Sequence, residues 1–284
     1  GDTDRAGVAN ANAWKDFGAN LDGIVSTATA NGECQLQAGA ASSARADGTN
    51  GIDNSFGKNI LPVLASVAGA NFTQQTNDAL TSSYFDYLIR VNGLDARSDI
   101  PSLTSALYAT GQLTSPKYDG TDRFPVLFES VTSSDLEKPK LSWQNAHMTA
   151  RVFDSGDSNG DGVFVLSFGL DSITVPMRKV RITMRVAADG SSATEGNLGG
   201  VIPTDAFVAE FRKLAGRFSQ SLCAGGALDA IVQQLRQASD IMQDGSQDPQ
   251  KTCDGISFGI GFDAKRDGVG AVLSPALPPV DVCE

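Results

Sequence analysis

The sequence of 284 residues has a single histidine, His147, and only four cysteines. None of the cysteines forms a Cys-x-x-Cys pair, so the residues that usually complete a structural zinc site are missing. A Walker loop, a Gly-x-Gly-x-x-Gly fingerprint and a His-Glu-x-x-His motif are also missing, which argues against the nucleotide-binding and zinc-protease classes that depend on them. No apolar run approaches the roughly 20 residues of a membrane-spanning helix, so we expect no transmembrane segment.

Charged residues are scarce, at 19% of the chain, and acidic residues outnumber basic ones, which gives a formal net charge of −11. Nucleic acids and anionic membranes select basic surfaces, so we do not expect either as a partner. Glycine is abundant, with 30 residues, and the sequence is rich in Ser, Thr, Ala and Asn. That composition favours a β-rich extracellular protein over a cytosolic helical enzyme.

The four cysteines are widely spaced and even in number, which predicts two disulfides formed in an oxidising compartment. Three pairings are open, and we favour Cys223–Cys253, around a predicted helix, and Cys34–Cys283, joining the two ends of the chain. The alternative is four buried free thiols. With no recognisable signal peptide at its start, the sequence is interpreted as a mature form that is secreted or held at the outer cell surface.

The clearest structural pattern lies between His147 and Val186. In residues 180–186, every second residue is apolar (Val180, Ile182, Met184, Val186) and the residues between them are polar. This alternation predicts an antiparallel strand with one solvent-exposed face. The run 163–168 is apolar on both faces, as in a buried strand. We therefore predict three consecutive strands joined by tight turns in the middle of an antiparallel sheet.

The remaining segments predict a single α+β domain over 1–284, an antiparallel β-sandwich or curled sheet with a helical hairpin near the C-terminus. Residues 1–13 are expected to form a loose arm, and 14–198 to be mainly β with a helical segment at 60–80. The hairpin covers 204–243, with Thr204 as its N-cap. The last part, 253–284, is a strand and a Pro-rich tail.

In that last strand, Ile256, Phe258 and Ile260 alternate with Ser257, Gly259 and Gly261. A face of small residues predicts the close approach of another backbone. Residues 255–259 also fit the Gly-x-Ser-x-Gly pattern of a nucleophile elbow. That elbow lies between a strand and a helix and is followed by Asp and then His. Here the alternation continues and the only histidine lies upstream, so we do not expect a serine hydrolase.

An Asp/Gly/Asn-rich tip at 154–162 is the candidate metal site. Residues 157–162 match the first six positions of a calcium loop, Asp-x-Asn-x-Asp-Gly, whose alternating oxygens suit a hard cation. The twelfth position, a Glu in such loops, is Phe168, and the chain leaves as a strand. The predicted ligands are Asp154, Asp157, Asn159 and Asp161, with weak affinity for calcium; the alternative is a solvated hairpin tip. A second oxygen-rich group (Asp47, Asn50, Asp53, Asn54) is interpreted as Asx-turns.

A local basic stripe comprises Arg178, Lys179, Arg181 and Arg185. In a strand, Arg181 and Arg185 share a face that could meet an anionic polysaccharide or an acidic partner. The alternative is a charged solvent face or a guarded sheet edge. The 33 acidic residues are too many for a glycosidase-type pair to be selected from the sequence.

Several sequence segments, taken together, resemble a group of uncharacterised secreted lipoproteins of myxobacteria. They are DGTNGIDNSFGKNILP (47–62), YDGTDRFPV (118–126), GVIPTDAFVAEFRKLAG (200–216), QASDIMQDGSQDP (237–249) and TCDGISFGIGFDA (252–264). The resemblance implies export and, in a full-length form, a lipid anchor on an N-terminal cysteine. We therefore expect a non-catalytic extracellular or cell-surface module that binds a protein or glycan partner, stabilised by calcium. The alternative is an extracellular carbohydrate hydrolase that uses carboxylates.

Overall fold

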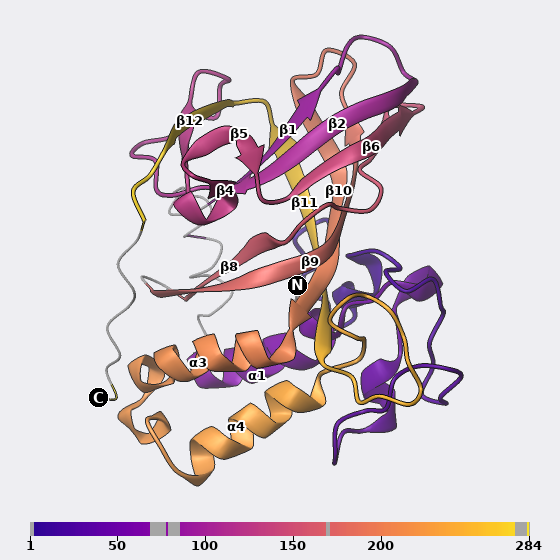
Figure 1. Ribbon diagram of the computed structural model, residues 1–284, viewed down its shortest axis with the longest axis vertical. Coiled ribbons are helices and arrows are strands. Elements are labelled where there is room, and N and C mark those ends of the chain that lie inside the picture. Colours follow the sequence, from indigo (N-terminus) through magenta and orange to yellow (C-terminus); the bar gives the residue numbers. More distant parts are fainter. Residues whose placement is uncertain (1–2, 69–77, 79–85, 169–170, 276–282, 284) are drawn as a thin grey trace.

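A curled antiparallel sheet organises the computed structural model, which describes residues 3–68, 78, 86–168, 171–275 and 283 (Figure 1). Its strand order is β1-β2-β6-β7-β9-β10-β11, and β8 also pairs with β9. The bounds are β1 (Tyr87–Asn92), β2 (Ile100–Ala109), β6 (Ser142–Thr149), β7 (Val152–Asp154), β8 (Gly162–Phe168), β9 (Asp171–Val186), β10 (Ser192–Pro203) and β11 (Gly255–Lys265). The predicted α+β class with a curled sheet is confirmed.

Two small strand pairs accompany the main sheet. Strand β12 (Gly268–Val272) runs parallel to β3 (Arg123–Val126), and β4 (Val131–Thr132) pairs antiparallel with β5 (Asp135–Pro139). Both pairs lie beside β1 and β2 in Figure 1.

Strand β9 is the long central strand, and its alternation follows the sequence pattern. Val180 and Ile182 are fully buried, and Met184 and Val186 nearly so. The alternation shifts phase at Lys179, whose φ of 49° marks an irregularity that turns both Arg178 and Lys179 outward. Strand β8 pairs with residues 171–177 of β9, and β7 pairs with 183–185. The antiparallel prediction over 163–186 is therefore confirmed.

The predicted tip is not a hairpin tip, because β7 and β8 pair with different parts of β9 rather than with each other. The connection between them runs alongside β9: Ser155 Oγ accepts from the Ile182 N–H (2.9 Å), and Ser158 Oγ accepts from the Val180 N–H (3.0 Å). Serine side chains thus replace strand pairing over this part of β9.

Three helices lie together at one end of the sheet: α1 (Leu61–Ala68), α3 (Thr204–Phe218) and α4 (Gly226–Gln237) (Figure 1). A π-helical turn, Phe56–Ile60, leads into α1. The predicted hairpin is confirmed, but it ends at 237 because Ile241 already forms a bridge with Gly255 of β11. Of the helical segment predicted at 60–80, residues 69–77 and 79–80 lie outside the described residues.

Thr204 is not the N-cap of α3, so that prediction is wrong. The helix begins at Thr204 itself, after Pro203, whose φ of −58° leads into it. The Thr204 hydroxyl instead pairs with Ser239 Oγ at 2.7 Å. Arg236 near the end of α4 forms an ion pair with Asp205 at 2.6 Å, which ties the two helices together.

The hydrophobic core fills the space between the sheet and the helices. The helices contribute Ile60, Leu64, Phe207, Phe211, Leu228 and Leu235, and the strands contribute Trp143, Phe153, Ile173, Met177, Ile182 and Phe258. Trp143, the largest fully buried side chain, donates its indole N–H to the Val180 carbonyl (2.9 Å). Its hydrogen-bond donor is therefore satisfied inside the core.

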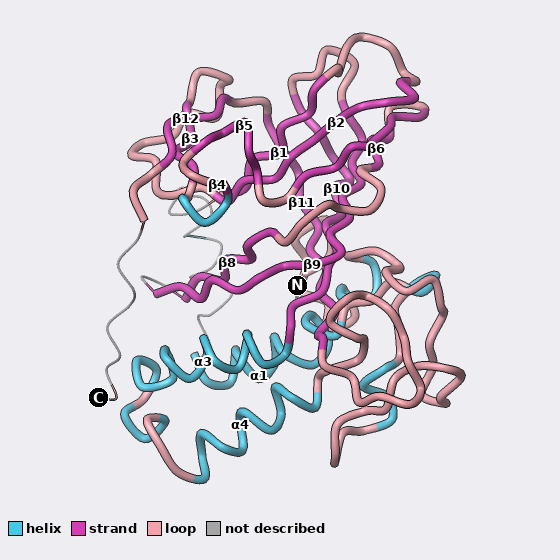
Figure 2. The backbone as a smooth tube through the Cα atoms, in the orientation of Figure 1, coloured by secondary structure: helices cyan, strands magenta, loops and turns pink. Residues whose placement is uncertain are grey.

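The N-terminal region contains loops and short helical turns rather than strands, so the prediction that 14–198 is mainly β is wrong for 14–60 (Figure 2). Its turns are Ala13–Asp16, Ser42–Arg45 and Thr49–Gly51, and within the described residues the first named strand begins at Tyr87. These loops lack period-2 alternation and are placed by hydrogen bonds to distant segments. The predicted loose arm contacts the sheet, because Arg5 donates to Asn197 Oδ1 at 2.7 Å.

The small face of β11 receives the backbone of residues 17–18, as the sequence predicts. A Cβ atom on Gly259 would come within 2.2 Å of the Phe17 carbonyl oxygen, and one on Gly261 within 2.3 Å of the Phe17 ring. Larger residues at these two positions would displace the N-terminal loop. The sheet therefore packs against its core on one face of β11 and against residues 17–18 on the other.

All four cysteines form disulfides, as predicted, but the favoured pairing is wrong. The bonds are Cys34–Cys253 and Cys223–Cys283, not Cys223–Cys253 and Cys34–Cys283. A parallel β-bridge between Gln35 and Thr252 positions the Cys34–Cys253 disulfide, because it places the adjacent Cys34 and Cys253 with their Cα atoms 5.2 Å apart. Cys223, just after α3, pairs instead with the end of the chain.

Candidate functional site

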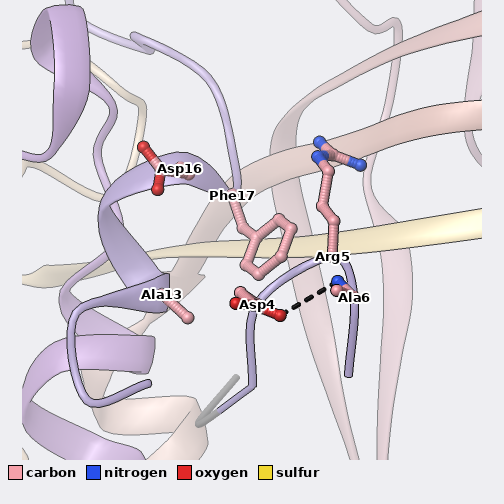
Figure 3. A pocket seen from close by; sticks show the side chains of 6 residues that line it. All are labelled: Asp4, Arg5, Ala6, Ala13, Asp16 and Phe17. Carbon is pink, nitrogen blue, oxygen red and sulfur yellow. Dashed lines mark hydrogen bonds between the residues drawn. The ribbon is translucent and has the colours of Figure 1, made fainter. Parts of the chain in front are cut away.

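A cavity of about 430 Å³ opens between the N-terminal arm and the turn at 13–17 (Figure 3). Its lining is Asp4, Arg5, Ala6, Ala13, Asp16 and Phe17. We call this cavity the arm pocket. Its size lies within the usual range of small-molecule sites, and charged groups stand beside apolar side chains, as in many such sites.

Short-range hydrogen bonds shape the arm that forms one wall. Asp4 Oδ1 accepts from the N–H groups of Ala6 (2.9 Å) and Val8 (3.0 Å), and Gly7 has a φ of 76°. Asp is a residue that stabilises such turns through its own side chain. The arm therefore folds back on itself and presents Asp4 and Arg5 to the cavity.

The opposite wall is fixed by contacts with β10, β11 and the loop at 47–51. The Phe17 ring rests on Gly261 and is 7% exposed. The Arg5 guanidinium lies 5.0 Å from the ring centroid, a cation–π distance. Asp16 Oδ1 accepts from the Thr49 hydroxyl at 2.8 Å. The lining thus combines two carboxylates with a guanidinium that lies over an aromatic ring.

Behind this wall lies a group of carboxyls that we call the inner acidic cluster: Asp22, Asp47, Asp53 and Asp240. Asp53 is 2% exposed, and its Oδ2 accepts from the Leu21 N–H at 2.6 Å. Burial, together with repulsion from Asp22 and Asp240, raises the pKa of Asp53 to about 9. Burial also raises the pKa of Asp240 to about 7, against the opposing effect of its hydrogen bonds from Ser257.

Ser257, the centre of the Gly-x-Ser-x-Gly match, belongs to this inner network. It is fully buried in β11, donates to Asp240 Oδ2 (2.5 Å) and accepts from the Ser55 N–H (2.9 Å). The strand continues through it, as predicted. Its hydroxyl is committed to Asp240 and Ser55 and holds β11 to the loops.

The three aspartates among the predicted metal ligands each form an ion pair with a different basic residue. Asp154 pairs with Arg181 (2.6 Å), Asp157 with Lys179 (3.7 Å) and Asp161 with Arg178 (3.0 Å). The backbone of Asn159 forms a bridge with Ser142. Among the residues that the structure describes, no group of three or more His, Cys, Asp or Glu is placed to hold a metal ion. Calcium binding by this loop stays a prediction.

The predicted basic stripe is largely neutralised by these same contacts. Arg181 is paired with Asp154, and Arg185 with Glu195 at 3.0 Å. Burial alone would raise the pKa of Asp154, but the hydrogen bond from Arg181 and the other groups around it hold that pKa below its usual value. A role of Arg181 and Arg185 in binding a partner stays a prediction.

The sequence analysis predicted neither the inner acidic cluster nor the arm pocket, because it interpreted Asp47 and Asp53 as Asx-turn residues. Asp47 and Asp53 were in the second oxygen-rich group, whereas Asp22 and Asp240 come from segments far away in the chain. The glycines of β11 were the one usable signal for the pocket, since they predict a backbone lying where Phe17 is found.

No family model matches the chain, and neither the curated proteins nor the solved structures contain a match. In the described part of the chain, no helix is both long and apolar enough to span a membrane.

Proposed function

We propose that the protein is a non-catalytic extracellular module that binds a glycan, or a protein partner presenting similar polar groups, in the arm pocket. The observation that carries the proposal is an open cavity of about 430 Å³ whose lining combines Asp4, Asp16, Arg5 and Phe17. Sugar hydroxyls both donate and accept hydrogen bonds, so a mixed set of carboxylates and a guanidinium suits them.

The proposed location is the outside of the cell, either secreted or, in a full-length form, attached through a lipid. Two disulfides support it, because such bonds persist mainly in oxidising compartments. Membership of the myxobacterial lipoproteins rests on the resemblance of these sequence segments alone and stays a prediction.

We expect glycan binding to depend on the arm pocket. The test is a glycan array probed with the wild-type protein, followed by titration of the best ligand into Arg5→Ala and Asp16→Asn. Each substitution removes a polar partner, so affinity should fall about tenfold or more, the loss expected when a charged hydrogen bond of about 1.5–3 kcal/mol disappears. Melting temperatures of both variants check that they are folded.

Arg97→Ala is the matched control, since Arg97 is an exposed arginine that forms an ion pair with Asp95, two residues before it. It should bind as the wild type does. Equal affinity of Arg5→Ala, Asp16→Asn and the wild type would contradict the assignment of the pocket. Release of free sugar, abolished by a single carboxylate substitution, would instead establish the carbohydrate hydrolase.

Calcium stabilisation remains a second proposal, attached to Asp154, Asp157, Asn159 and Asp161. Bound calcium would add free energy to the folded state alone, so millimolar calcium is expected to raise the melting temperature of the wild type. Asp157→Ala should abolish that rise, and magnesium at equal concentration is the control for ionic strength. An unchanged melting temperature at millimolar calcium would contradict the proposal.

A further inference from the structure

The two carboxylates that line the arm pocket each have one oxygen that does not hold the fold together. Asp4 Oδ1 accepts from the N–H groups of Ala6 and Val8, and Asp16 Oδ1 accepts from the Thr49 hydroxyl. Within the part of the chain that the structure describes, Oδ2 of Asp4 and Oδ2 of Asp16 have no hydrogen-bond or ion-pair partner. An ionised carboxylate only accepts hydrogen bonds, so the lining offers a ligand two charged acceptors.

The guanidinium in the same lining is held by the protein itself. Arg5 donates to Asn197 Oδ1 at 2.7 Å and to the Gly196 carbonyl at 3.3 Å, and it lies 5.0 Å from the centroid of the Phe17 ring. Both acceptors are uncharged, and Figure 3 shows the Arg5 side chain extending to the side opposite the Asp4 carboxylate. Arg5 therefore covers one face of Phe17 without neutralising Asp4.

The charges around the cavity favour a positively charged ligand. Two carboxylates and one guanidinium line it, which leaves one net negative charge. The nearest other cations in the sequence, Lys15 and Lys58, place their Nζ atoms 5.6 and 4.8 Å from the Trp14 ring, and neither belongs to the lining. The whole chain carries a formal charge of −11, so its field attracts cations and repels anions.

We propose that the ligand of the arm pocket is a glycan with free amino groups, an amino sugar whose ammonium donates to the carboxylates of Asp4 and Asp16. An ammonium has three N–H donors and no acceptor, which matches groups that only accept. Hydrogen bonds between two charged groups are roughly twice as strong as those between neutral ones. The inference rests on the proposed function, because it names the class of glycan for the same pocket.

Three β-1,4-linked tetrasaccharides of equal length test the role of the ammonium: those of glucosamine, glucose and N-acetylglucosamine. Each is titrated calorimetrically into the wild type at pH 5.5, where an amine with an ordinary pKa of about 7.7–8.0 is protonated. The glucosamine tetramer should bind about tenfold or more tightly than the glucose tetramer. The N-acetylglucosamine tetramer should show no such gain, since acetylation removes the charge.

Asp4→Asn and Asp16→Asn test where the ammonium binds. Asparagine keeps an Oδ1 acceptor for the existing bonds of each residue and replaces the second carboxylate oxygen with an amide donor. Each substitution should reduce the preference for the glucosamine tetramer by about threefold or more. Asp119→Asn removes the same charge from an exposed loop residue and should keep the full preference of the wild type.

The possible results separate the class of glycan from glycan binding itself. Equal affinity for the three tetrasaccharides, lost in Arg5→Ala, would leave the glycan-binding pocket in place and overturn the amino sugar. A preference that survives both Asp4→Asn and Asp16→Asn, or falls equally in Asp119→Asn, would assign it to the overall charge and also overturn it. Binding of tetralysine but not of the glucosamine tetramer would assign the pocket to a basic peptide. No binding of any glycan would contradict the proposed function and this inference together.

Discussion

Replacing Cys34 and Cys253 with alanine is expected to lower the free energy of unfolding by about 5 kcal/mol. The bond closes a loop with a sequence separation of 219 residues, so it removes a large conformational entropy from the unfolded chain. Both cysteines are also fully buried. Denaturant unfolding of the wild type and the double variant under non-reducing conditions measures the difference.

The matched control is the double alanine variant at Cys223 and Cys283, whose sequence separation is 60. The shorter loop predicts a smaller loss, about 4 kcal/mol, because the entropy grows with the logarithm of loop length. Non-reducing peptide mapping of the wild type checks the pairing. A peptide joining Cys223 to Cys253, or a larger loss for the shorter loop, would contradict the structure.

Asn54→Ala is expected to destabilise the protein by about 4 kcal/mol, an unusually large effect for a polar residue. The buried side-chain amide donates to the carbonyls of Phe17 (2.9 Å), Gly259 (3.0 Å) and Trp14 (3.2 Å). Its oxygen accepts from the N–H groups of Gly57 (2.9 Å) and Gly259 (3.0 Å). Removing the side chain leaves several buried backbone groups unsatisfied, each at a cost of about 1–3 kcal/mol when no water replaces the partner.

Asn92→Ala is the control for Asn54→Ala. Its side chain is exposed and bonds Thr104 Oγ1 at 3.2 Å, so its loss should stay within about 0.5 kcal/mol. Chemical denaturation of the two variants beside the wild type makes the comparison. A loss below about 1 kcal/mol for Asn54→Ala would show that Asn54 does not join the N-terminal loop to β11.

The parts of the fold that the sequence predicted well are those with a local periodic signal. Val180, Ile182 and Met184 alternate with polar residues, and burial at every second position follows directly from strand geometry. The hairpin of α3 and α4 shows helical spacing for the same reason. The N-terminal loops carry no such period, since their path is set by single side chains such as Asn54 that reach a distant strand.

Long-range partners were the main source of error. The pairing of Cys34 with Cys253 depends on the bridge between Gln35 and Thr252, which no local pattern reveals. Asp157 and Asp161 suit calcium by residue type, and no local pattern shows that Lys179 and Arg178 lie beside them; calcium binding itself stays a prediction. Asp53 resembles a turn residue in the sequence, and only its burial in the structure explains why its pKa is raised.

We propose that Arg5, Asp16 and Phe17 form the binding surface of the protein. This proposal is tested most directly by adding the best array glycan to isotopically labelled protein and mapping the chemical shift changes by NMR. The account predicts changes concentrated at residues 4–6 and 13–17, with residues 178–185 of β9 unaffected. Changes confined to Arg181 and Arg185, or spread without a maximum at the arm pocket, would contradict it.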